Sequence, residues 1–336
     1  MSSPDFSLRA AALRRMACVF ALGLLAGGIL TQAGMAGPDP AARLLRDGFE
    51  GGAFSPRSGL YYRDNAEQRA GSYRFVQEGA RAGKSALELT VVPHCAPGAL
   101  RCSERAEVWQ DTRNRVPYEE GVWTALSMRL GAPVPQDDHR YVMMQWKREI
   151  RPGAEGDFSP FLALRMRAGV LFATIESNYH PPRPGLPRPE KGQCPRGLVP
   201  VWLRPDTGQM RFLVAVGAGW RPELAREFDR CSDALRLSGP GFLPAARPVW
   251  HDYLFYTRPG PGGEGQIELV VDGRRVVRAE GVIGAAGAGL GPHQYFKFGP
   301  YRDAHQSRWT LYFDSFARGP ACRAVAPAAV CAGLGE

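Results

Sequence analysis

The sequence predicts an all-β protein built as an antiparallel β-sandwich. Short runs of alternating apolar and polar residues recur between turn residues, and few stretches have helical periodicity. The 40 glycines and 29 prolines, with 10% aromatic residues, suit a sheet protein rich in turns. The 336 residues, 44% of them hydrophobic, are enough to enclose a sizeable core.

Residues 1–36 have the pattern of a secretory signal peptide. Arg9, Arg14 and Arg15 precede a short apolar run, and Ala36 ends a stretch of small residues that suits cleavage. Because the apolar run is short for a membrane span, we expect a periplasmic or secreted protein with no membrane attachment after cleavage. The mature chain, 37–336, is expected to be a single domain.

Six cysteines remain after the leader, and an even number in an exported chain predicts disulfides. We prefer pairing between sequence neighbours among the connectivities that six cysteines allow, namely Cys95–Cys102, Cys194–Cys231 and Cys322–Cys331. The chain has no Cys-x-x-Cys pair, which argues against a structural zinc site. We expect no metal and no cofactor, and we leave a structural calcium site open.

The formal net charge of +9 admits nucleic acid, anionic lipid or an acidic polymer as a partner. Lysines and arginines are spread along the chain without a long basic run, so nucleic acid is disfavoured. An anionic polysaccharide suits an exported basic protein better. A monomer is the default expectation for the oligomeric state.

Strands are expected in order along the mature chain. The stretch 47–50 opens the domain as a first strand that pairs with the last one. The following strands are expected at 73–77, 86–92 and 122–130, and then in a hairpin of 161–166 and 170–176 across Arg-Ala-Gly.

The second half of the chain contains a segment rich in proline and glycine at 181–248. We expect it to be an elaboration of the sandwich that forms a rim of the groove, with a short strand at 211–216 and a helix at 222–234. The strands that follow are expected at 253–256 and 266–271, at 275–278 after an Asp272-Gly273 turn, and at 308–316 as the closing strand.

The strand expected at 294–303 has the most informative polar face. Side chains alternate between the two faces of a strand, so its two phenylalanines point into the core. The opposite face carries Tyr295, Lys297, Gly299 and Tyr301. We expect the glycine to leave room for something to approach the backbone.

Two further strands offer polar faces. In the stretch 103–110, Arg105, Glu107 and Trp109 share a face. In the stretch 141–149, the polar face is expected to hold Tyr141, Met143, Gln145 and Lys147. If the polar faces of all three strands line one concave sheet, they form a positive groove with a phenol in it.

The pattern Tyr-Phe-Lys-x-Gly-x-Tyr at 295–301 resembles the signature strand of polysaccharide lyases with a β-jelly-roll fold, a group that includes the alginate, glucuronan and heparin lyases. Arg-x-Glu at 105–107 resembles the early arginine motif of the same group. The third motif is typically Gln-x-His, and here 145–147 has Gln-Trp-Lys, so the histidine is replaced. The resemblance implies a jelly roll with a substrate groove that cleaves a polysaccharide containing uronic acid by β-elimination.

The resemblance also implies roles for individual residues. Arg105 and Gln145 would bind the uronate carboxylate and stabilise the enolate-like intermediate. Tyr301, assisted by Lys297, would remove the proton at C5 and protonate the leaving oxygen at C4. The remaining candidates for substrate binding are Lys147, Glu107, Tyr295, His293 and His180.

The replaced histidine predicts which sugar is cut. In D-glucuronate and D-mannuronate the C5 proton and the C4 oxygen lie on the same side of the ring, so one tyrosine can serve as base and acid. L-guluronate and L-iduronate need a second group across the ring, for which histidine is suited near neutral pH. A lysine such as Lys147 is better suited to holding a carboxylate. We expect glucuronan, then mannuronate-rich alginate, as substrates, with His180 or His293 as groups that would restore the missing base.

Two other functions remain open from the sequence. A glycoside hydrolase needs two carboxylates flanking the bond, and no strand has the Glu-x-Asp-x-x-Glu pattern common in such enzymes on this kind of sandwich. A carbohydrate-binding protein without catalysis would keep the groove and would not need Tyr301. Each site residue also fits a structural role alone, such as an ion pair of Arg105 with Glu107. Together, on three strands in family order, they favour the lyase.

Overall fold

The computed structural model describes residues 44–336 apart from gaps at 65–68, 97–98, 100–101, 155–157, 159, 179–185 and 191–192. The expected signal peptide at 1–36 and the candidate His180 lie outside the described residues. Among the described residues, no helix is long and apolar enough to cross a membrane.

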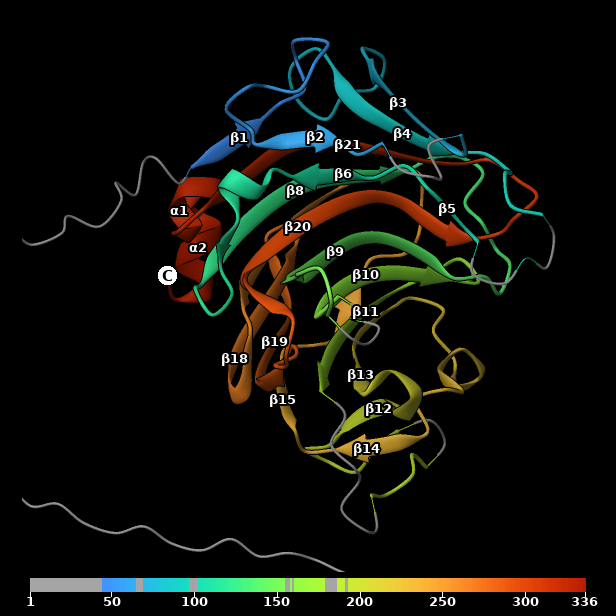
Figure 1. The fold of residues 1–336 in the computed structure, drawn as a ribbon, viewed down its shortest axis with the longest axis vertical. Coiled ribbons are helices and arrows are strands. Elements are labelled where there is room, and N and C mark those ends of the chain that lie inside the picture. Colours follow the sequence, from blue (N-terminus) through green and yellow to red (C-terminus); the bar gives the residue numbers. More distant parts are fainter. Residues whose placement is uncertain are drawn as a thin grey trace, which may run out of the picture. The chain divides into compact units, whose positions relative to one another are not determined.

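Two sheets make up most of the described chain, and the predicted antiparallel sandwich is confirmed (Figure 1). The nine-stranded sheet, within the described residues, consists of β15 (Leu235–Ser238), β19 (Arg274–Ile283), β18 (Gly260–Val271), β17 (Trp250–Arg258), β8 (Val122–Leu130), β21 (Trp309–Gly319), β4 (Ala86–Val91) and β3 (Gly71–Val76), with β1 (Leu45–Asp47) paired to β21.

The twelve-stranded sheet carries the stretches that the sequence singled out. Within the described residues it consists of β14 (Arg230–Ser232), β12 (Val199–Arg204), β13 (Gln209–Gly217), β11 (Val170–Asn178), β10 (Leu162–Arg167), β9 (Tyr141–Ile150), β20 (Leu290–Asp303), β6 (Val108–Gln110) and β2 (Leu60–Tyr62), with β16 (Phe242–Leu243) paired to β13, and with β5 (Ser103–Arg105) and β7 (Val116–Pro117) paired to β20. All of its pairs are antiparallel except β13 with β16.

Aromatic side chains from both sheets meet in the core between them. Trp146 of β9 packs on Phe255 of β17, with ring centroids 4.2 Å apart, and Phe298 of β20 packs on Phe313 of β21 at 4.8 Å. Each fully buried side chain of this kind contributes about 1.5–3 kcal/mol. The core therefore fixes which face of β9 and β20 is turned outward.

Both predicted hairpins are present, and their turn residues explain why. Asp272 and Gly273, between β18 and β19, have φ angles of 51° and 75°; Ala168 and Gly169, between β10 and β11, have 47° and 69°. Two successive residues with positive φ form the turn whose twist matches that of the flanking strands. The predicted pairing of the first strand with the last is also confirmed, because Leu45 of β1 lies opposite Arg318 of β21.

The six cysteines described form the three predicted disulfides. Cys322–Cys331 links the two short helices α1 (Cys322–Val325) and α2 (Ala328–Leu334). Cys194–Cys231 joins the connection before β12 to β14.

The prediction of a helix at 222–234 is wrong. Only Pro222–Ala225 is helical, as a single 3-10 turn, and the chain then forms strand β14. Cys231 lies opposite Pro200 of β12 and is bound to Cys194. Strand pairing and the disulfide therefore override the local helical pattern.

The predicted faces of β9 are correct only for its second half. The register against β10 shifts by one residue between Met144 and Val142, so the alternation changes there. Tyr141, expected on the polar face, is buried with its ring 4.7 Å from Trp309 of β21. Val142 takes its place and lies opposite Tyr301 of β20.

Gly299 was expected to admit something close to the backbone, and the group that approaches is part of the same chain. A Cβ at this position would lie 2.1 Å from the carbonyl oxygen of Ala106, and its φ of +126° favours glycine. Ala106 in turn donates its backbone N–H to Pro300 at 2.9 Å. The glycine therefore allows the 103–110 stretch to pack closely against β20.

A buried ion pair joins the same two segments. Arg302 of β20 and Glu104 of β5 are fully buried, with Nη2 and Oε2 2.7 Å apart. Glu104 also accepts the backbone N–H groups of His94 and Cys95 at 2.7 and 3.2 Å. The carboxylate thus holds the loop closed by Cys95–Cys102 against β20.

Replacing Glu104 by Gln leaves the Arg302 guanidinium buried without its counter-charge. We expect the free energy of unfolding to fall by about 3–5 kcal/mol, measured by denaturant titration. The matched change Glu78→Gln, at an exposed position, is expected to alter it by less than about 0.5 kcal/mol. Equal effects of the two changes would contradict a stabilising role for the buried pair.

Candidate active site

The outward face of the twelve-stranded sheet, here called the site face, brings three of the predicted stretches together. Lys297 of β20 lies opposite Gln145 on β9 and opposite Trp109 on β6. Tyr301 lies opposite Arg105 on β5. The alternation of β20 turns its phenylalanines inward and these polar residues outward.

Glu107 is the centre of a buried polar cluster on this face. Its carboxylate accepts from Lys297 Nζ at 2.9 Å and from Gln145 Nε2 at 2.7 Å, and Arg105 Nη1 lies 4.0 Å away. Glu107, Lys297 and Gln145 are each no more than 3% exposed. Burial lowers the pKa of Lys297, and the opposing effect of Glu107 is smaller. The three residues are therefore held beneath the surface, where they position their neighbours.

Tyr301 lies half-buried between two guanidinium groups. The Cζ atoms of Arg105 and Arg140 lie 4.4 and 4.6 Å from the centroid of its ring. Arg140 Nη2 donates a hydrogen bond of 3.0 Å to the phenol oxygen and also pairs with Asp303. The phenol oxygen therefore faces a cationic donor, and its ring lies between two positive charges.

Lys297 is also close to Tyr301, as the sequence suggested. Its Nζ lies 5.8 Å from the centroid of the Tyr301 ring and 4.6 Å from that of Trp109. The ammonium donates a hydrogen bond to Glu107. Among the described residues, no hydrogen bond from Lys297 to the Tyr301 phenol oxygen is present. The positive charge of the ammonium nevertheless adds to that of Arg105 and Arg140 around the ring.

Tyr295 belongs to a second group farther along β20. Its ring stacks on that of Trp109, with the two centroids 5.4 Å apart. The ring also contacts Arg115, whose Cζ lies 4.5 Å from its centroid. Burial raises the pKa of Tyr295, which keeps the phenol neutral. Lys147 lies opposite Tyr295 on β9 and is partly exposed on the site face.

His293 does not join the Tyr301 group. Its Nδ1 lies 3.0 Å from Oε2 of Glu149, and the eight residues to Tyr301 span roughly 26 Å of strand. Arg115 holds the other oxygen of Glu149 at 2.9 Å. His293 therefore lies near the Tyr295 end of the strand.

Arg140 and Asp303 are the site residues that the sequence analysis missed. Arg140 precedes β9 and Asp303 ends β20. At a strand end, the alternation of side chains does not show to which face of the sheet a residue belongs. The sequence did contain a signal for them, because Arg140 directly precedes the stretch 141–149 and Asp303 ends the stretch 294–303. Two oppositely charged residues at the ends of neighbouring strands can form an ion pair. Whether they meet depends on the register between the two strands, which the sequence alone does not give.

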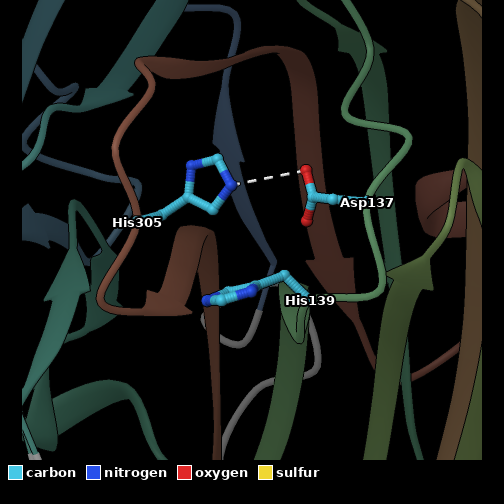
Figure 2. Close-up of side chains that lie close together, drawn as sticks. All are labelled: Asp137, His139 and His305. Atoms are coloured by element: carbon cyan, nitrogen blue, oxygen red, sulfur yellow. Dashed lines mark ion pairs between the residues drawn. The ribbon is translucent and has the colours of Figure 1, made fainter. Parts of the chain in front are cut away.

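Asp137, His139 and His305 form a cluster (Figure 2). His139 directly precedes Arg140 in the chain, and His305 lies two residues after Asp303. One potential ligand atom from each lies within 4.8 Å of the others, so the group has the composition of a metal site. The same residues also make contacts of their own: His305 Nε2 lies 3.3 Å from Asp137 Oδ2, and His139 Nε2 lies 2.9 Å from the carbonyl oxygen of Ala304. A carbonyl only accepts, so His139 Nε2 carries a proton there, and only Nδ1 of this ring could bind a metal.

In this arrangement the cluster braces two loops. Asp137 and His139 precede Arg140, while His305 follows Asp303 on the connection from β20 to β21. Burial lowers the pKa of His305 and outweighs the opposing effect of Asp137. The cluster therefore holds Arg140 and Asp303 in place beside Tyr301.

These features define a two-sheet sandwich with a tyrosine set among arginines on one face. The family model described as polysaccharide lyase matches residues 50–317, and the chain belongs to this family. The protein is thus a polysaccharide lyase. No match is found among the curated proteins.

One of the solved structures that this chain resembles has a TM-score above 0.5, which shows a shared fold. An endo-beta-1,4-glucuronan lyase from the fungus Trichoderma reesei is 16% identical and has a TM-score of 0.53; the alignment covers 84% of this chain and 96% of that one. The cellulose induced protein Cip1 is 12% identical, with a TM-score of 0.43 and coverages of 82% and 97%. Alginate lyase Aly36B is 11% identical, with a TM-score of 0.40 and coverages of 82% and 96%.

A double-mutant cycle tests the buried cluster. Lys297→Met leaves the Glu107 carboxylate without its cation, and Glu107→Gln leaves the ammonium without its anion. We expect each single change to lower the free energy of unfolding by about 3 kcal/mol or more, and the double variant to lose clearly less than the sum.

The partly exposed pair Arg278–Glu280 provides the control cycle. For Arg278→Met with Glu280→Gln we expect a coupling energy below about 1 kcal/mol in the same denaturant titrations. Strict additivity of the Lys297 and Glu107 changes would show that the buried contact contributes nothing.

Proposed function

We propose that the protein is an exported lyase that cleaves a polymer of D-glucuronate by β-elimination, with Tyr301 as the residue that moves the proton. The observation that carries this proposal is the Tyr301 phenol held by Arg140 at 3.0 Å, between the guanidinium groups of Arg105 and Arg140. This arrangement combines a proton acceptor with positive charge at one point of the site face.

The proposed mechanism needs the carboxylate of the sugar to be neutralised first. Arg105, whose side chain is 22% exposed, is the candidate that reaches the substrate carboxylate. Positive charge on this group makes the C5 proton more acidic because it stabilises the enolate-like intermediate. Gln145 and Lys297 act from beneath by fixing Glu107, which in turn lies beside Arg105.

The proton then passes through Tyr301. The phenolate removes the proton from C5, the C4–oxygen bond breaks with electrons going to the leaving oxygen, and the phenol returns its proton to that oxygen. The products are an unsaturated uronate at one new end and a free hydroxyl at the other. Arg140 stabilises the phenolate between these steps.

The proposed sugar follows from the residue at position 147. On β9, Lys147 stands at the position where the resemblance implies a histidine, and His139 and His305 make their contacts within the cluster beside Arg140 and Asp303. A single tyrosine serves both proton transfers only when the C5 proton and C4 oxygen are on the same side of the ring. This favours D-glucuronate and D-mannuronate over L-guluronate and L-iduronate.

Export is supported by two independent features. The sequence begins with a basic segment, an apolar run and small residues, as a secretory leader does. The structure contains three disulfides, which persist in oxidising compartments such as the periplasm or the extracellular space.

The variant Tyr301→Phe is the direct test of the mechanism. We expect elimination, followed by the ultraviolet absorbance of unsaturated uronate ends, to fall about 100-fold or more because the proton acceptor is lost. Binding of a saturated glucuronan oligosaccharide, measured by calorimetry, is expected to change little. The control Tyr73→Phe, exposed on β3, should keep full activity. Wild-type turnover in Tyr301→Phe would remove this residue from the mechanism.

The sugar assignment is tested with polymers of defined composition. We expect the initial rate on glucuronan to exceed that on polymannuronate, and both to exceed those on polyguluronate and iduronate-rich heparin, because one tyrosine serves a syn elimination. Preferred cleavage of polyguluronate or heparin would refute the assignment. New reducing ends without ultraviolet absorbance would instead indicate a hydrolase, and neither signal a binding protein.

A further inference from the structure

Two segments of the chain remain side by side where the pairing of β9 with β20 ends. Within the strands, Arg302 of β20 lies opposite Tyr141 of β9. Beyond them, three contacts between the segments continue the same antiparallel order, namely Arg140–Asp303, His139–Ala304 and Asp137–His305. The ring of His305 is therefore connected, through its neighbours in the chain, to the ion pair that holds the Tyr301 phenol oxygen.

The two ring nitrogens of His305 have different partners (Figure 2). Nδ1 lies 3.0 Å from the backbone nitrogen of Ser307 and 2.8 Å from its hydroxyl oxygen. A backbone N–H only donates, so Nδ1 accepts, and the proton of the neutral ring is on Nε2. The Nε2–H faces Asp137, whose Oδ2 is 3.3 Å away. Because Nε2 carries this proton, it offers no lone pair to a metal ion.

A second proton on His305 does not fit these contacts. The new N–H at Nδ1 would point at the backbone N–H of Ser307, which is also a donor. The guanidinium of Arg302 lies 3.4 Å from the same nitrogen, and it cannot withdraw because Glu104 holds it in a buried ion pair. Protonation therefore opens the turn between His305 and Ser307.

The charged and titratable groups around this ring come from several elements. They are Asp137 and His139 before β9, Tyr141 on β9, Arg302 on β20 and, beyond Arg302, Glu104 on β5. Burial lowers the pKa of His305, Arg302 and His139 act in the same direction, and Asp137 opposes them. The stability that the neutral ring contributes is complete above the ordinary histidine pKa of about 6.5, and it is lost as the pH falls through the lowered one.

We propose that His305 is a positioning residue that couples the reaction at Tyr301 to proton concentration: the neutral ring keeps Asp303 on Arg140, and the protonated ring releases this pair from the phenol. The inference rests on the proposed lyase function and concerns the regulation of its site. His139 Nε2 holds Ala304, between Asp303 and His305, at 2.9 Å. A change in the turn at His305 is thereby carried to Asp303, whose carboxylate orients the Arg140 guanidinium toward the phenol.

The variant His305→Asn separates the charge of the ring from its contact with Ser307. The asparagine side-chain oxygen replaces Nδ1 as the acceptor, and it does not titrate. We expect the ratio of wild-type kcat to variant kcat on glucuronan to be constant above about pH 7 and to fall about tenfold for each pH unit below the His305 midpoint, because one proton silences the wild type. Groups that titrate in both proteins cancel in this ratio.

Two further variants complete the series, and thermal unfolding of each is measured at every pH. His305→Gln places its amide where Nε2 is and leaves the Ser307 N–H without its acceptor, so kcat should be low at every pH. His251→Asn is the matched control, because this histidine of β17 also contacts an aspartate, with Nδ1 2.7 Å from Asp272. It should follow the wild type throughout. An acid limb of the same shape in His305→Asn and the wild type overturns the proposal.

An NMR titration of the wild type in the presence of EDTA distinguishes failure of this inference from failure of the lyase function. The imidazole nitrogen signals report the tautomer and the midpoint of His305, and the Nε–H signal of Arg140 reports its pairing with Asp303. We expect the Nε2–H tautomer and an Arg140 signal that changes with the His305 midpoint. If these changes are observed and the wild type eliminates no uronate polymer, the coupling stands and the lyase function falls. A constant Arg140 signal, or an Nδ1–H tautomer, overturns the coupling even where elimination is observed.

Discussion

Two buried ion pairs join β20 to the short stretch 104–107, one from each side of the sheet. Glu104 binds Arg302 on the side of the core, and Glu107 binds Lys297 on the site face. Breaking a buried pair leaves an uncompensated charge, so the two segments keep one register. Arg105 lies between the two glutamates in the sequence, and this register is what places its guanidinium over Tyr301.

The sequence predicted those parts of the site where alternation is unbroken. On β20 the apolar and polar faces follow the residue order, so Lys297 and Tyr301 were assigned correctly to one face. On β9 the register shift near Met144 reverses the alternation, and Tyr141 enters the core. The residues at 141–144 are all apolar or aromatic, so their order does not reveal the bulge, which appears only in the pairing with the neighbouring strand.

The arginines around the site were the harder part to predict. Arg165 and Arg211 lie on strands that the sequence did predict, yet their common partner Glu176 is on a third strand. A single charge in an apolar strand indicates a buried polar contact, but its partner is known only from the strand order. Arg140 was missed for a related reason, since it precedes its strand and meets Tyr301 across the sheet.

The pairs at Glu104 and Glu107 also determine when the molecule can fold. Lys297 is 190 residues from Glu107 in the chain, and Arg302 is 198 residues from Glu104. Contacts between such distant residues form slowly, because the loop between them must close first. Glu104 and Glu107 therefore lack these counter-charges until β20 has been synthesised. A chain of this topology can form its two buried ion pairs only after most of its length is available for pairing.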